Sequence, residues 1–307
     1  MISDVLIAAL LLGAAALILT AALAPLETLS WWAGWTEEEL DASPVAPKSG
    51  GGDQRHYIVY LSGVASISGQ FLLPREKAFI RRLRDKFPDA VIVSDVFPYS
   101  PQGQPLLEGA RMFDRLWRRA QMFQIKERNA LLLLLINLRN VFQVMVSADH
   151  RYGPIFNQGA ARVIEAALIE DGYKRGSGAA VTIIGYSGGA QVAAGAAAFL
   201  KARLRAEIYV ISIGGVLASD PGLRHVRKFH HVIGLRDNIQ RVGSVLFPER
   251  WSLLPTSEWN AGKRDGRIEI HRLEGVAHAG VKGYFGRPPI DGLSNAERTL
   301  NKIAPLI

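Results

Sequence analysis

Val181-Thr182-Ile183-Ile184-Gly185-Tyr186-Ser187-Gly188-Gly189 is the stretch that decides the fold. Its first four residues are apolar or β-branched, which is typical of a buried strand. An alanine-rich segment follows at once, from about Gly188 to Leu204, and favours a helix. A strand that passes directly into a helix is half of a β–α–β unit, so this stretch predicts a parallel sheet covered by helices.

The same alternation continues on both sides of this stretch. Apolar and β-branched runs predict strands at 56–61, 90–96, 207–213, 229–235 and 267–273, and helical periodicity predicts helices at 74–87, 156–172 and 294–303. The last helix has Ser294 as its N-cap and Glu297 in position to complete a capping box. We therefore predict an α/β fold whose mostly parallel sheet carries helices on both faces.

An insertion at about 100–152 interrupts the alternation. Within it the strongly apolar segment 129–147 predicts a helix, because Asn129, Arg139, Asn140, Gln143 and Ser147 fall within an arc of about 100°. Two roles stay open for it: a helix buried on the core, or a lid or membrane-dipping helix over a lipid site. A second membrane span is disfavoured because it would split the alternating pattern across the membrane.

The stretch also contains the pattern G-x-S-x-G, at residues 185–189. A sharp turn between strand and helix needs small flanking residues, and Gly185 and Gly189 supply them. Such a turn holds Ser187 in a strained conformation with its hydroxyl exposed above the sheet edge. Ser187 is therefore a candidate nucleophile, against the alternative of a Gly-Ser turn without chemistry.

A serine nucleophile needs a base, and the base needs a carboxylate that orients it. Of the seven histidines, His278 follows the last strand in a loop of small residues, which can bring its ring back over the sheet edge. Asp237 directly follows the strand at 229–235, at the edge where ligand sites of open α/β sheets gather. Asp220 is the reserve candidate for the carboxylate.

The order Ser187, Asp237, His278, with the strand–turn–helix context of the serine, resembles the α/β-hydrolase superfamily over about residues 55–307. The resemblance implies that Ser187 is the nucleophile, His278 the general base and acid, and Asp237 the orienting carboxylate. It also implies an oxyanion hole made by the backbone N–H of Gly188 and by one from the loop after the first strand, with Gly63 and Val64 as candidates.

The chain departs from the lipase pattern in two ways. It has no His-Gly-Gly-Gly motif, and Ser62 stands where many relatives have histidine. The first two strands of the superfamily also have no counterpart, which predicts a compact core version of the fold.

The N-terminus holds an uncharged apolar run of twenty residues, from Val5 to Ala24. This is long enough to span a bilayer as a helix. A cleaved signal peptide is the alternative, but the run lacks a basic start and Pro25 follows it directly. We expect a membrane anchor and interfacial segment at 1–35, a flexible linker at 36–53 and the folded domain at 54–307. The protein should therefore be a single-pass membrane protein, with the side of its domain undetermined.

The charge, motif content and cysteine count narrow the classes of function that remain possible. Residues 51–307 hold 35 basic and 22 acidic side chains, a net charge of +13. This excess of basic residues predicts either a basic surface that is simply solvated or one that attracts anionic lipid. No nucleic-acid motif is present. The chain has no cysteine, which excludes disulfides and thiolate metal sites. His225, His230 and His231 lack a regular ligand spacing, so we expect no metal and no cofactor.

These observations favour a membrane-anchored serine hydrolase that cleaves carboxylic ester or thioester bonds of lipid-like substrates through an acyl-enzyme. A lipid acyltransferase, in which an alcohol replaces water, would use the same residues. A catalytically inactive binding or scaffold protein of the same fold at the membrane is a further alternative. A peptidase is disfavoured because nothing resembles a substrate-gating domain.

Overall fold

The computed structural model describes residues 56–66, 72–99, 130–287, 289–290 and 292–307, together with Ala15 and Leu19. Apart from those two residues, the predicted anchor lies outside the described part of the chain. The same holds for the linker at 36–53 and for residues 100–129 of the insertion. Within the described residues, no helix combines the length and the apolar character needed to cross a membrane.

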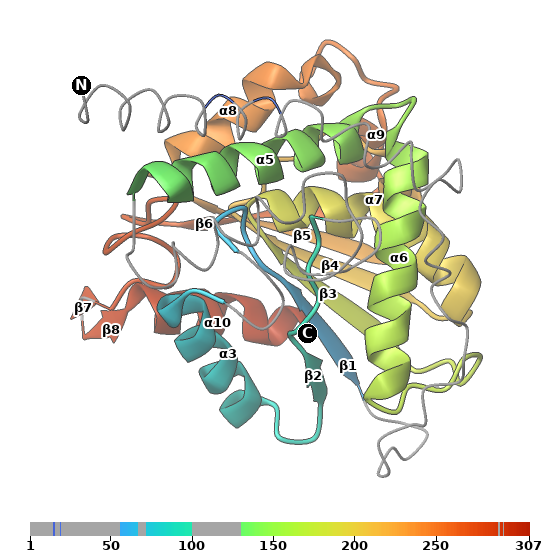
Figure 1. Cartoon of the computed structure of the whole chain (residues 1–307), viewed down its shortest axis with the longest axis horizontal. Coiled ribbons are helices and arrows are strands. Elements are labelled where there is room, and N and C mark those ends of the chain that lie inside the picture. The colour runs from blue at the N-terminus through green and yellow to red at the C-terminus, as the bar shows by residue number, and fades with distance from the viewer. Residues whose placement is uncertain are drawn as a thin grey trace, which may run out of the picture.

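Six strands form one sheet in the order β2-β1-β3-β4-β5-β6, and every neighbouring pair is parallel (Figure 1). Each strand lies within or close to a run that the sequence predicted, and the α/β class with a mostly parallel sheet is confirmed. The strands are β1 (Tyr57–Leu61), β2 (Val91–Val93), β3 (Val181–Tyr186), β4 (Ile208–Ile213), β5 (Lys228–Gly234) and β6 (Ile268–Leu273).

One face of the sheet is covered by α6 (Gly153–Glu170), α7 (Gly188–Leu204) and the short α9 (Glu258–Arg264). Alternate strand residues such as Val59, Ile183 and Val210 point to this face and are fully buried. The small residues of α7 allow the helix to pack closely on the sheet, so that its first three turns are buried on nearly all sides.

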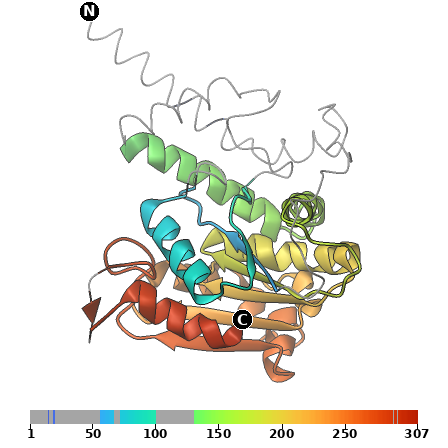
Figure 2. The same ribbon diagram turned by 90° about the horizontal axis from the view of Figure 1, so that it is seen from below.

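The other face is covered by α3 (Pro74–Lys86) and α10 (Asn295–Ile303), which lie side by side (Figure 2). Phe79 of α3 and Ile303 of α10 pack against the strand residues of this face. The predicted capping box is present, since Ser294 and Glu297 exchange their hydrogen bonds at the start of α10. Both faces of the sheet are therefore covered, as predicted.

Helix α5 (Ala130–Ala148) is the described part of the insertion, and it packs on α7 and α6. Its polar stripe is turned inward: Arg139, Asn140, Gln143 and Ser147 are buried. By contrast, Leu134, Val141 and Met145 of its apolar surface are exposed. The helix thus meets the protein partly with its polar side, an arrangement that neither predicted role specified.

The sequence did not predict the elements between β5 and β6. Helix α8 (Asn238–Leu246) directly follows the candidate carboxylate, and two 3-10 turns, Pro221–Arg224 and Pro248–Arg250, flank it in the chain. Helix α8 is only nine residues long, too short for its periodicity to predict a helix, and its apolar residues Ile239, Val242 and Val245 face solvent. A short antiparallel pair, β7 (Pro289–Ile290) and β8 (Leu293–Ser294), precedes α10.

Candidate active site

Ser187 lies in the turn between β3 and α7, at the carboxyl edge of the sheet. Its backbone has φ 53° and ψ −121°, and within the described residues only Arg205 is another non-glycine residue with positive φ. Such a conformation costs about 1–3 kcal/mol and persists only where the surroundings enforce it. They do so here, because the Ser187 N–H donates to the Ile213 carbonyl at 3.0 Å.

Gly185 makes this turn possible. A Cβ atom at this position would lie 2.6 Å from the Cα of Ala190, which is too close for any side chain to fit. The helix therefore folds back tightly onto the strand that precedes it. As a result the Ser187 side chain projects from the sheet edge, and it is nonetheless only 6% exposed.

His278, the candidate base, lies beside Ser187. Its Nε2 lies 2.9 Å from Oγ of Ser187, a hydrogen-bonding distance. The loop that carries it follows β6 and is held by Tyr186, whose hydroxyl donates to the His278 carbonyl at 2.7 Å and whose ring stacks on the imidazole. Tyr186, the residue that precedes the serine, therefore holds both the backbone and the ring of His278.

Asp237 supplies the expected carboxylate. Its oxygens lie 2.9 and 3.0 Å from Nδ1 of His278, and the residue is fully buried. Two further groups donate to it: the Tyr284 hydroxyl at 2.8 Å and the backbone N–H of Gln240 at 2.9 Å. Burial raises the pKa of Asp237, but the hydrogen bonds from His278, Gln240 and Tyr284 outweigh it and hold that pKa below its usual value.

The reserve carboxylate, Asp220, lies elsewhere. It caps the 3-10 turn at Pro221–Arg224 through the Gly222 N–H and accepts a hydrogen bond from Gln191 at 2.9 Å. Burial raises its pKa to about 6. These contacts give Asp220 a structural role on the α7 side of the sheet.

The loop after β1 lies beside Ser187, as the resemblance implied. A Cβ atom on Gly63 would contact the Tyr186 ring at 2.9 Å, and one on Gly188 would lie 2.8 Å from the Val64 side chain. Asn140 of α5 fixes the loop by donating to the carbonyls of Val64 and Ser66, at 2.7 and 2.9 Å. The polar stripe of α5 therefore holds the candidate oxyanion loop.

Glu76 of α3 is a buried carboxyl on the other side of this loop. The backbone N–H groups of Gly63 and Leu73 and the Tyr60 hydroxyl lie near this carboxyl and lower its pKa. Burial nevertheless dominates and raises the pKa of Glu76 to about 7. Gly63 and Val64 both stay candidates for the second oxyanion donor.

A pocket of about 470 Å³ opens beside His278. Its walls are largely apolar and aromatic, with two arginines and one carboxyl among them. The lining residues are Leu73, Pro74, Arg75, Glu76, Tyr186, His278, Ala279, Gly280, Gly283, Tyr284, Phe285 and Arg287.

Exposed apolar side chains gather on α8 and on the loop that follows it. We call this set the apolar rim; it begins at Ile239, two residues after Asp237, and therefore adjoins the site. Its members are Ile239, Val242, Val245, Leu246, Trp251, Leu253 and Leu254, which are between 42% and 81% exposed. An exposed set of this size is typical of a contact surface for a partner, a ligand or a membrane.

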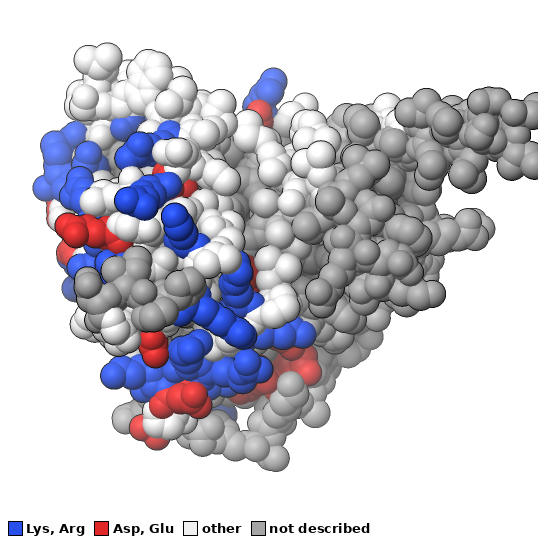
Figure 3. Space-filling view, turned by 90° about the vertical axis from the view of Figure 1, so that its left-hand side faces the viewer, with Lys and Arg blue, Asp and Glu red and all other residues white. Residues whose placement is uncertain are grey.

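Basic residues form a second surface feature. Lys and Arg outnumber acidic residues on one face of the molecule (Figure 3). Arg81, Arg82 and Arg84 of α3 line a hollow of about 420 Å³ together with Arg287, which also lines the pocket beside His278. The basic surface thus continues to the candidate active site.

Comparisons with known proteins find no matching family model and no matching curated protein. The chemistry of the site therefore rests on its own geometry. The structure brings together Ser187, His278, Asp237, Gly188 and the loop with Gly63 and Val64. Sequence reasoning missed Tyr186, Tyr284, Glu76 and Asn140, which hold those groups in place.

Proposed function

We propose that this protein is a serine hydrolase with an α/β-hydrolase fold, which cleaves carboxylic esters or thioesters through an acyl-enzyme. The observation that carries the proposal is the continuous relay from Ser187 through His278 to Asp237, with contacts of 2.9 Å on each side of the imidazole. A serine alone is a weak nucleophile, and this relay is the arrangement that activates it.

In the proposed reaction Nε2 of His278 takes the proton of the Ser187 hydroxyl as Oγ bonds to the substrate carbonyl carbon. The carbonyl oxygen becomes an oxyanion, which the backbone N–H groups of Gly188 and of Gly63 or Val64 stabilise. When the tetrahedral intermediate collapses, the bond to the leaving group breaks and His278 gives it the proton. Water then repeats both steps on the acyl-enzyme and releases the acid and free Ser187.

The surroundings of the site favour a lipid-like substrate. The apolar rim and the apolar pocket walls suit acyl chains, and the predicted anchor at 5–24 would keep the domain at a bilayer. The pocket opens beside His278, the residue that protonates the leaving group. Arg75 and Arg287 in its wall would favour a leaving group that carries negative charge.

Ester hydrolysis by the full chain in detergent tests the proposal. We would assay p-nitrophenyl esters and acyl thioesters of increasing chain length, with Ser187→Ala as the inactive variant. Its matched control is Ser252→Ala, at an exposed serine between Trp251 and Leu253 whose replacement by alanine leaves the rim apolar. We expect hydrolysis by wild type and Ser252→Ala and a loss of at least ~1,000-fold in Ser187→Ala. Equal rates in folded Ser187→Ala would contradict the proposal.

A further inference from the structure

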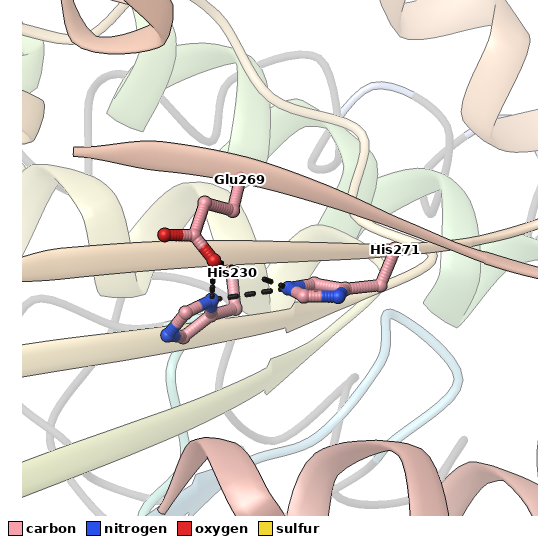
Figure 4. A group of neighbouring side chains, drawn as sticks. All are labelled: His230, Glu269 and His271. Atoms are coloured by element: carbon pink, nitrogen blue, oxygen red, sulfur yellow. Dashed lines mark hydrogen bonds and ion pairs between the residues drawn. The ribbon is translucent and has the colours of Figure 1, made fainter. Parts of the chain in front are cut away.

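Two histidines and one glutamate from β5 and β6 point toward one another, away from the site described above (Figure 4). The strands are parallel, and their register pairs His230 with Glu269 and Val232 with His271. Side chains two residues apart on a strand share a face, so Glu269 and His271 both project on the side of His230. All three reach the face of the sheet that α3 and α10 cover.

The spacing of their three ligand atoms suits a small metal ion. Nδ1 of His230 lies 3.1 Å from Nε2 of His271 and 3.5 Å from Oε2 of Glu269, and the last two atoms are 3.9 Å apart. A tetrahedral Zn²⁺ with bonds of about 2.0–2.1 Å holds its ligand atoms about 3.3–3.4 Å apart. The observed distances bracket that value, so only small side-chain movements are needed.

The protonation of the cluster also suits metal binding. Burial lowers the pKa of both His230 and His271, which keeps their imidazoles neutral, the form that coordinates metals. Lys228 and Lys302 also lie near enough to lower those pKa values, and Glu269 opposes them. Lys228 donates to Oε1 of Glu269 at 2.6 Å, which orients the other carboxylate oxygen toward the imidazoles.

We propose that His230, Glu269 and His271 bind one divalent transition-metal ion of the zinc class, with water as the fourth ligand. The ion would fasten β6, an edge strand of the sheet, to β5. His230 lies in the first half of β5, whereas Asp237 follows the end of that strand. The proposed ion would therefore lie apart from the relay of Ser187, His278 and Asp237.

Zn²⁺ titration of the full chain in detergent, after chelator treatment, tests this proposal. We expect calorimetry to give one equivalent of Zn²⁺ per chain and thermal unfolding to shift upward on binding. His271→Gln and Glu269→Gln should each weaken the binding by at least ~10-fold and remove the shift. The matched controls are His225→Gln, an exposed histidine outside the cluster, and His278→Gln; both should bind as wild type does.

Three results would overturn the proposal: no stoichiometric binding by the folded wild type, undiminished binding by folded His271→Gln and Glu269→Gln, or loss of binding in folded His278→Gln. The wild type also provides a test that needs no variant. Co²⁺ added in place of Zn²⁺ should give the intense visible absorption of a tetrahedral site, and Zn²⁺ should abolish it. Weak absorption of octahedral type would contradict the proposed geometry.

Discussion

The hydroxyl of Tyr284 donates a hydrogen bond of 2.8 Å to Oδ2 of Asp237 and accepts one of 2.7 Å from the Gly234 N–H. Burial and the nearby charge of Asp237 raise the pKa of Tyr284, so its proton stays in place to stabilise the carboxylate. Tyr284 therefore links the end of β5 to the residue that orients His278.

Tyr284→Phe should reduce kcat/KM about tenfold, since a hydrogen bond to a charged group contributes about 1.5–3 kcal/mol. Without this donor the pKa of Asp237 rises, so activity should disappear at a higher pH on the acid side than in wild type. The Gly234 N–H also loses its partner, at a cost of about 1–3 kcal/mol in unfolding free energy. A pH–rate profile beside Tyr209→Phe checks this; identical profiles would refute the role of Tyr284.

Glu76 should make the protein less stable as the pH rises. Its pKa is about 7 in the folded state against a usual value of 4.5, so the folded protein binds the extra proton between those values. Stability is therefore fully retained below about pH 4.5 and falls by about 3 kcal/mol as the pH passes 7. Asp220, with a pKa of about 6, contributes in the same direction at lower pH.

Glu76→Gln isolates the contribution of Glu76 to the pH dependence of stability. Glutamine resembles the protonated carboxyl and keeps an acceptor oxygen near the Gly63 N–H. The variant and wild type should have similar unfolding free energies at pH 5, and the variant should be more stable at pH 8 by about 2–3 kcal/mol. Urea unfolding at both pH values measures this. A variant that is less stable than wild type at pH 8 would show that the charged form of Glu76 is favourable.

Asn140→Ala should loosen the loop that carries Val64. The carbonyls of Val64 and Ser66 lose their shared donor, and the oxyanion donor moves relative to Ser187. A displacement of about 1 Å at such a position can cost about 100-fold in rate, so we expect kcat to fall about 10- to 100-fold with KM little changed. Val141→Ala, the exposed neighbour on α5, is the control. A rise in KM at unchanged kcat would assign Asn140 to substrate binding instead.

The apolar rim predicts a difference between soluble and aggregated substrates. Val245→Asp and Leu253→Asp place a charge on side chains that are 70% and 81% exposed, so folding should not suffer. Hydrolysis of long-chain esters in vesicles should fall at least ~5-fold, while that of short soluble esters stays unchanged. Ser177→Asp adds the same charge near the start of β3, at the opposite edge of the sheet. Equal losses of activity on both kinds of substrate would contradict a role of the apolar rim in contacting vesicles.

The central strands β1, β3 and β4 were the most predictable, because they are buried on both faces and read as largely apolar runs, as Val181–Ile184 does. The turn at Ser187 was predictable because only small residues permit it. Helix α8 was not, since it is only nine residues long and a pattern of that length does not separate a helix from a short apolar run. The inward polar stripe of α5 was also hidden, because amphipathic periodicity alone does not tell which side of a helix meets the protein.

Contacts between side chains that lie far apart in the sequence were the hardest to predict. Ser187, Asp237 and His278 could be chosen because all three follow strand ends at the same sheet edge. Tyr284 could not, since its contact with Asp237 spans 47 residues and depends on how the loop after β6 folds back. The His230–Glu269–His271 cluster depends on the register of two strands, whereas adjacency in the chain grouped His230 with His225 and His231, and that spacing predicted no metal.

Covalent labelling with a fluorophosphonate, followed by peptide mapping, tests the activated serine most directly. The probe would be added to the folded full chain in detergent, with Ser187→Ala, His278→Ala and Ser252→Ala beside it. We predict one phosphonyl group per wild-type chain, on the peptide that contains Ser187, with no adduct in Ser187→Ala, strongly slowed labelling in His278→Ala and full labelling in Ser252→Ala. An unlabelled wild type, in the presence and absence of anionic vesicles, or an adduct on another residue would contradict the assignment of Ser187 as the nucleophile.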